Sequence, residues 1–235
     1  MNPFAAFNSL NPREEEAIHR NVLRILDEVG FRVENEALLA RLADVGGHVD
    51  REQSLAKFSP ELVARFLDES EPFAWDEVTP AVSASADVYL GAYLDPLSDQ
   101  FVPWDLDRLR RYVKLAHYLE HVSVGGMLGC PLADVPKAVH PLHQRYLCWK
   151  LGLGVGGSLW AVGLAPYLLE MGQVMAAATG RDARDFFSGA VYLQSPLQFG
   201  RAEAEQYVWF ADRGYRVGVG LMMSCGGTGP ATLAG

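Results

Sequence analysis

Apolar positions in the first third of the chain recur with a helical period. Over residues 11–30 they lie three and four positions apart, which predicts an amphipathic helix. The stripe consists of Ile18, Val22, Ile25, Leu26 and Val29. Asn11 is a suitable N-cap, Pro12 suits the first helical position, and Gly30 ends the pattern.

Two shorter segments repeat this design. Residues 34–47 have the same helical spacing of apolar positions, and residues 59–70 begin with Ser59 as a cap followed by Pro60. No cluster of reactive side chains accompanies these helices, which is typical of scaffolding. We therefore expect residues 1–80 to form an N-terminal helical segment.

A β-hairpin is predicted over residues 81–103. The stretch "DVYLGAYL" has strand character, "DPLSD" is a turn signal, and "QFVP" can return antiparallel to the first strand. We expect this hairpin to separate the helical segment from the rest of the chain.

Helical and strand patterns alternate from residue 104 to the end, which indicates a parallel sheet covered by helices. Helices are predicted over 105–121, 140–150, 165–180 and 201–214. Strands are predicted over 122–129, 151–158, 186–196 and 215–224. A (β/α)8 barrel needs eight strands, and residues 104–235 supply about four strand–helix units without the last helix. We therefore expect the α/β fold of the first half of a TIM barrel, and a chain that is part of something larger.

Composition and charge exclude several classes of function. The 235 residues are 49% hydrophobic, as in a globular protein with a substantial core, and the net charge is −9. Nonspecific binding to nucleic acid is not expected, because nothing would neutralise phosphates. The basic stretch 107–114 is interpreted as the solvated face of a helix.

Cysteine usage and the absence of a leader predict a cytoplasmic protein. Cys130, Cys148 and Cys225 are widely spaced, so reduced thiols are expected. The first twenty residues lack the basic and apolar regions of a secretory signal. Residues 151–169 carry no charge, but five glycines, a serine and a proline interrupt them. We predict a strand, a loop and a helix there rather than a membrane span.

Five motifs in order resemble the trimethylamine methyltransferase family, over nearly the whole chain. They are residues 21–50, "SPELVARFLDES" (59–70), "PLADVP" (131–136), "YLQSPL" (192–197) and "GGTGPATLAG" (226–235). The resemblance implies a (β/α)8 barrel behind an N-terminal helical segment. It also implies transfer of a methyl group from a methylated or quaternary amine, such as trimethylamine or a betaine, to cob(I)alamin. The cobalamin would be carried by a separate corrinoid protein, and no cofactor would be bound by this chain directly.

Candidate site residues lie where predicted strands end, because barrel chemistry sits at the C-terminal ends of strands. Gln194 and Ser195 end the third strand and could hydrogen-bond a substrate, although a turn-only role explains them equally well. Asp134 could face a cationic headgroup, and the favoured alternative is a cap of the following turn. The glycine-rich end suits a carboxylate or merely a tight turn. That group consists of Gly226, Gly227, Thr228 and Gly229.

Aromatic faces would recognise a quaternary ammonium, which has no proton to donate. Tyr192 alternates onto the same side of its strand as Gln194, and Trp149 and Trp160 flank the second strand. The competing interpretation is that these rings pack in the core, as large aromatic residues usually do.

A metal site is not expected. His140 and His143 lie three apart and would share a helix face, but a third ligand is not apparent. The sequence thus predicts a corrinoid-dependent amine methyltransferase, incomplete in these residues alone, that works with a corrinoid protein and forms a homo-oligomer at full length.

Two alternatives stay open. The chain could be an inactive fragment or a half-barrel subunit that acts as a binding or assembly module. It could also be another TIM-barrel enzyme such as a lyase, which would need a lysine at a strand end. Lys114, Lys137 and Lys150 fall in helices or loops.

Overall fold

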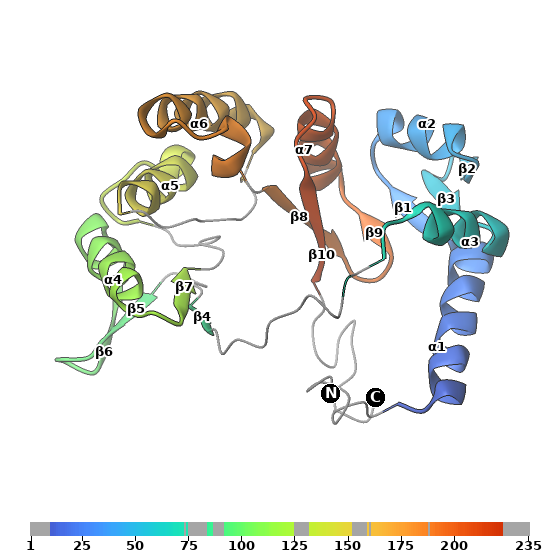
Figure 1. The fold of residues 1–235 in the computed structure, drawn as a ribbon, viewed down its shortest axis with the longest axis horizontal. Coiled ribbons are helices and arrows are strands. Elements are labelled where there is room, and N and C mark those ends of the chain that lie inside the picture. The colour runs from blue at the N-terminus through green and yellow to red at the C-terminus, as the bar shows by residue number, and fades with distance from the viewer. Residues whose placement is uncertain are drawn as a thin grey trace. The chain divides into compact units, whose positions relative to one another are not determined.

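A computed structural model of the chain describes residues 10–72, 74, 84–86, 92–124, 132–151, 159, 161–187 and 189–222. Figure 1 shows the helices and strands of these residues. The chain divides into two compact units. Unit 1 consists of Met1–Ala81, Tyr192–Ala204 and Leu221–Gly235, and unit 2 of Val82–Val191 and Glu205–Gly220.

The three predicted N-terminal helices are confirmed in unit 1. They are α1 (Pro12–Arg24), which continues as a π-helical turn (Ile25–Val29), α2 (Glu36–Asp44) and α3 (Pro60–Glu69). Asn11 caps α1 through a complete capping box, in which its side chain accepts from Glu14 N and Glu14 accepts from Asn11 N. Gly30 ends the turn at φ 81°, and a Cβ there would lie 2.6 Å from Ala56 O, so only glycine fits.

Short strands also occur in this segment, which was predicted to contain helices only. They are β1 (Phe31–Val33), β2 (His48–Asp50) and β3 (Leu55–Lys57), which pair antiparallel in the order β1–β3–β2. Each has three residues, too few to show a period of two in the sequence. Strand β9 (Gln198–Phe199) pairs parallel to β1, with Arg32 opposite Gln198.

Unit 2 opens with a strand that the sequence did not reveal. Strand β4 (Ala84–Ala86) pairs parallel to β7 (Val122–Val124). The hairpin of β5 (Ala92–Asp95) and β6 (Gln100–Pro103) is confirmed as antiparallel. It follows β4, so one strand of a parallel pair precedes the hairpin in the chain. The small side chains of β4 lack the hydrophobic alternation by which strands are recognised.

Four further helices match the predicted alternation. They are α4 (Leu106–Tyr118), α5 (His140–Lys150), α6 (Ala165–Thr179) and α7 (Arg201–Ala211). Strand β7 follows α4, strands β8 (Gly189–Gln194) and β9 follow α6, and strand β10 (Val217–Met222) follows α7. The strand order of the largest sheet is β10–β8–β9–β1–β3–β2. The mixed α/β class is confirmed, whereas the half barrel stays a prediction. Most of the predicted strand 151–158 lies outside the described residues.

Among the described residues of unit 2, two apolar clusters form the core. One joins α4 and α5 around Trp104, whose ring meets Tyr93 edge-on at 5.1 Å. The other joins α5, α6 and α7 around Trp149, Leu168 and Phe210. No helix in the described part of the chain combines the length and the apolar character needed to cross a membrane.

Candidate functional site at the end of strand β8

Three predicted site residues stand together where β8 ends. Tyr192 and Ser195 are half-buried and Gln194 is exposed, so the end of the strand is open to solvent. Residues 195–197 form a tight turn, because Gln194 pairs antiparallel with Gln198 of β9. The turn, which was the alternative to substrate binding, is therefore present. Because side chains alternate along a strand, Tyr192 and Gln194 lie on the same side of β8.

Gly200 and Glu203 belong to this place as well, and the sequence reasoning missed them. A Cβ atom at Gly200 would lie 2.8 Å from Glu203 Oε2 and 3.1 Å from Gln194 Nε2. The amide of Gln194 and the carboxylate of Glu203 therefore both lie next to Gly200, which has no side chain. An acidic residue in the first turn of α7, just after a strand end, was the signal available. We call Tyr192, Gln194, Ser195, Gly200 and Glu203 the β8-end cluster.

The loop after β8 is held by the N-terminal strand β1. Arg32 N donates to Leu197 O at 2.9 Å, and Glu34 N donates to Phe199 O at 3.0 Å. The side chains continue this contact, because Gln198 Nε2 donates to Glu34 Oε1 at 2.9 Å. The N-terminal segment thus fixes the backbone that carries the β8-end cluster, all within unit 1.

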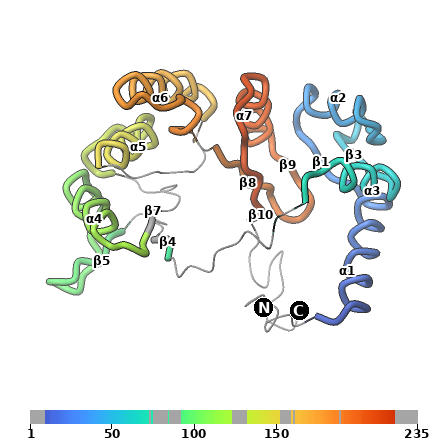
Figure 2. Tube along the Cα trace, viewed as in Figure 1, coloured from blue at the N-terminus to red at the C-terminus, as the bar shows by residue number. Residues whose placement is uncertain are grey.

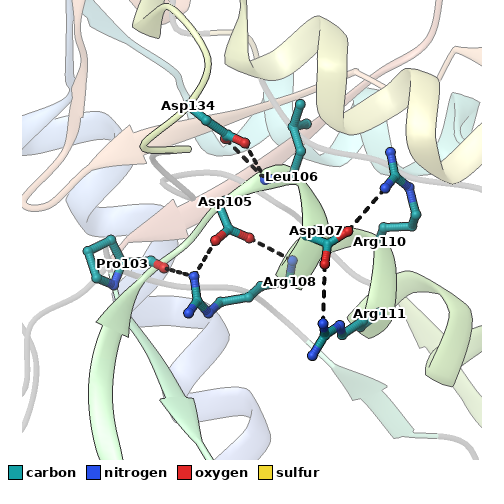
Figure 3. A network of polar contacts seen from close by, with 8 residues as sticks. All are labelled: Pro103, Asp105, Leu106, Asp107, Arg108, Arg110, Arg111 and Asp134. Carbon is teal, nitrogen blue, oxygen red and sulfur yellow. Dashed lines mark hydrogen bonds and ion pairs between the residues drawn. The ribbon is translucent and has the colours of Figure 1, made fainter.

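Asp134 has a different partner from the two that were considered. Its carboxylate accepts from the backbone N–H of Leu106, with oxygen distances of 3.1 and 3.3 Å (Figure 3). The prediction that it caps the turn following it was wrong, because the N–H it accepts belongs to the first turn of α4. Asp105 caps the same helix by accepting from Arg108 N at 2.7 Å. Asp134 is exposed, and its proposed contact with a substrate stays a prediction.

Basic side chains on α4 are paired with aspartates of the same helix start. Arg110 and Arg111 each contact Asp107 at 3.2 Å, and Arg108 pairs with Asp105 (Figure 3). Arg110 and Arg111 are exposed. This agrees with the interpretation of the basic stretch as a solvated helix face.

His140 is a structural residue. It is fully buried, with Leu132 N donating to Nδ1 at 3.4 Å and Nε2 lying 2.6 Å from Val135 O. These contacts select the neutral tautomer with the proton on Nε2, which donates to Val135 O. Among the described residues, no group of three or more His, Cys, Asp or Glu side chains is placed to hold a metal ion.

Burial disfavours the charged forms of two titratable groups on α5. Burial raises the pKa of the Cys148 thiol to about 12, so it is no nucleophile near neutral pH. Burial likewise lowers the pKa of Arg145 to about 10.

Lys57 in β3 is the strand lysine that the sequence reasoning overlooked, and its Nζ donates to Glu28 O at 2.7 Å.

Of the two tryptophans offered as cation-binding faces, one is described and one is not. Trp149 has only 8% of its surface exposed and meets Phe186 edge-on at 6.0 Å, as expected for a packing role. Trp160 lies outside the described residues, and so do Gly226, Gly227, Thr228 and Gly229.

Comparison with known families gives a match that spans the chain. The family model described as trimethylamine methyltransferase (MTTB) matches residues 1–235. The comparison with curated proteins found no match.

Proposed function

The chain belongs to the trimethylamine methyltransferase family, and from this premise we propose that it removes a methyl group from a methylated amine. The amine is trimethylamine or a betaine-like quaternary amine, and the acceptor is the cob(I)alamin of a separate corrinoid protein. The family match supports the class of reaction. The observation that carries the location is the β8-end cluster, where an amide and a carboxylate meet over Gly200.

The chemistry asks little of the protein's own functional groups. The bond between nitrogen and the methyl carbon breaks, the amine leaves with the bonding electrons, and the corrinoid supplies the nucleophile that takes the methyl group. No proton has to move when the nitrogen is quaternary. The protein must hold the methyl carbon in line with its acceptor and keep water away.

The β8-end cluster has groups suited to holding such a substrate. The carboxylate of Glu203 offers negative charge to the ammonium group, and the ring of Tyr192 offers an aromatic face. The amide of Gln194 can donate a hydrogen bond to the carboxylate of a betaine. A cluster with these three groups accepts a zwitterion better than an uncharged amine.

The corrinoid is assigned to a partner rather than to this chain. His140 does not fit as a ligand to cobalt, because both of its ring nitrogens are engaged by backbone groups. We therefore treat cob(I)alamin as a substrate that a corrinoid protein delivers, and we propose the protein itself to be a cytoplasmic homo-oligomer.

Titration calorimetry of the protein expressed from its gene, with glycine betaine and with trimethylammonium chloride, tests this location. Glu203→Gln is expected to weaken binding about three- to tenfold, because it removes the negative charge from a partly screened charge pair with the ammonium group. Gln194→Ala should weaken glycine betaine more than trimethylammonium, which has no carboxylate. Glu205→Gln removes the same charge from an exposed position of α7 and should change neither. Failure of both amines to bind, or equal losses in the two glutamate variants, would overturn the assignment.

A further inference from the structure

A groove between α5 and α6 in unit 2 shares no residue with the β8-end cluster. The two helices lie side by side (Figure 1 and Figure 2), and the space between them measures about 420 Å³. Binding sites for small molecules commonly occupy about 300–1,000 Å³ and are mostly apolar with a few polar groups. This groove is large enough for such a ligand.

Aromatic rings line both walls of the groove. Tyr146 and Trp149 lie three apart on α5, and Tyr167 and Glu170 lie three apart on α6, so each pair shares a helix face. Trp149 is buried, while Tyr146 and Tyr167 are 51% and 59% exposed. The lining of the groove thus includes one buried ring and two rings that are open to solvent.

Glu170 gives the groove its charge. It is the only charged side chain among the described residues that line the groove, and it is also the only one in α6. It makes no ion pair or side-chain hydrogen bond with the described residues, and it is exposed. A carboxylate beside three aromatic rings favours a cation over an anion or a neutral molecule.

One ring of the groove already attracts a cation. Lys150 Nζ lies 5.6 Å from the centre of the Tyr146 ring and donates to the Tyr146 hydroxyl at 3.4 Å. Lys150 is outside the set of residues that line the groove, so it approaches this ring from the rim. The Tyr167 ring, three residues from Glu170 on α6, remains for a ligand, and Trp149 adds the small part of its surface that is exposed.

We propose that this groove binds an organic cation with an apolar body, such as an arylalkylammonium ion. The charged nitrogen lies between Glu170 and the Tyr167 ring, and the apolar body covers Trp149 and Met171. This site stands on the lining residues alone and does not depend on the proposed methyl transfer.

Ligand-detected NMR titration with benzyltrimethylammonium and with its neutral carbon isostere, neopentylbenzene, tests the site in the protein expressed from its gene. The cation should bind about tenfold more tightly than the isostere. Glu170→Gln should weaken the cation by about three- to tenfold, as for a partly screened charge pair, and leave the isostere unchanged. Glu205→Gln is the matched control and should alter neither affinity.

Ring variants separate recognition from folding. Tyr167→Phe keeps an aromatic face and should retain binding of the cation, whereas Tyr167→Leu should lose it with an unchanged circular dichroism spectrum. Equal affinity for the cation and its isostere, or no saturable binding of either, would overturn the proposal. So would self-association in sedimentation velocity that Tyr167→Leu abolishes and the cation does not, because the groove would then be an interface between copies.

Discussion

Helices α1 and α5 differ in how their sequences relate to their burial. α1 has a strong apolar stripe and a complete capping box, yet none of its residues is buried, and Ile18 and Val22 are 51% and 46% exposed. α5 has no side-chain cap and little segregation of apolar residues, yet seven of its eleven residues are buried, including His140 and Arg145. Local signals determine that a helix forms, whereas tertiary packing determines which of its faces is covered.

The largest expected difference between α1 and α5 is the loss of unfolding free energy when one apolar side chain of each helix is truncated. Leu147→Ala on α5 removes a side chain that is 5% exposed and packed in the first core cluster, so it should cost about 2–5 kcal/mol of unfolding free energy. Ile18→Ala on α1 should change it by less than about 0.5 kcal/mol. Urea denaturation of both variants gives the comparison. Similar losses would show that the α1 stripe is buried in solution.

Alkaline pH should lower the free energy of unfolding through Cys148, a buried residue of α5. The ordinary pKa of the Cys148 thiol is 9.0, and burial raises it to about 12 in the folded protein. Between pH 9 and 10 the unfolded chain loses this proton and the folded chain keeps it. The free energy of unfolding should therefore fall by about 1 kcal/mol over that interval as pH rises.

Arg145 opposes this fall in the free energy of unfolding at higher pH. Its pKa is lowered by burial to about 10, so above that pH the folded chain loses a proton that the unfolded chain retains, which opposes the loss. Denaturation midpoints of the wild type and Cys148→Ala at pH 9 and 10 isolate the thiol. A Cys148→Ala variant with the same slope as the wild type would contradict its burial.

The smallest effect should come from the cap of α1. Asn11→Ala removes the acceptor of two backbone N–H groups, worth about 1 kcal/mol of local helix stability. Amide hydrogen exchange in the first turn of α1 should accelerate about fivefold. Because α1 buries none of its residues, the global denaturation midpoint should stay unchanged. A shift of the whole transition would show that α1 unfolds together with the core.

Helices were predictable because their signals are local. Caps, proline at the first position and a helical period place α3 and α5 within a residue of their observed bounds. The strands β1 and β4 were missed because three residues show no periodicity, and their pairing depends on distant segments. Arg32 N donates to Leu197 O, which lies far away in the sequence, and no local pattern encodes such a contact.

The candidate site was predictable only in part, for a similar reason. Gln194 and Ser195 follow from their position at a strand end, which the alternation of helices and strands indicates. Gly200 and Glu203 join them only when the turn after β9 brings α7 back to the same place. The partner of Asp134, the Leu106 N–H, likewise comes from packing between segments that are far apart in sequence.

The central claim is the methyl transfer, and the most direct test follows the methyl carbon. The protein expressed from its gene is incubated with free cob(I)alamin and ¹³C-methyl-labelled trimethylamine or glycine betaine under reducing conditions, and NMR records where the label goes. We predict that the label leaves one of the two amines and appears on the corrinoid, only when the protein is present. Label that stays on both amines throughout would contradict the proposed function.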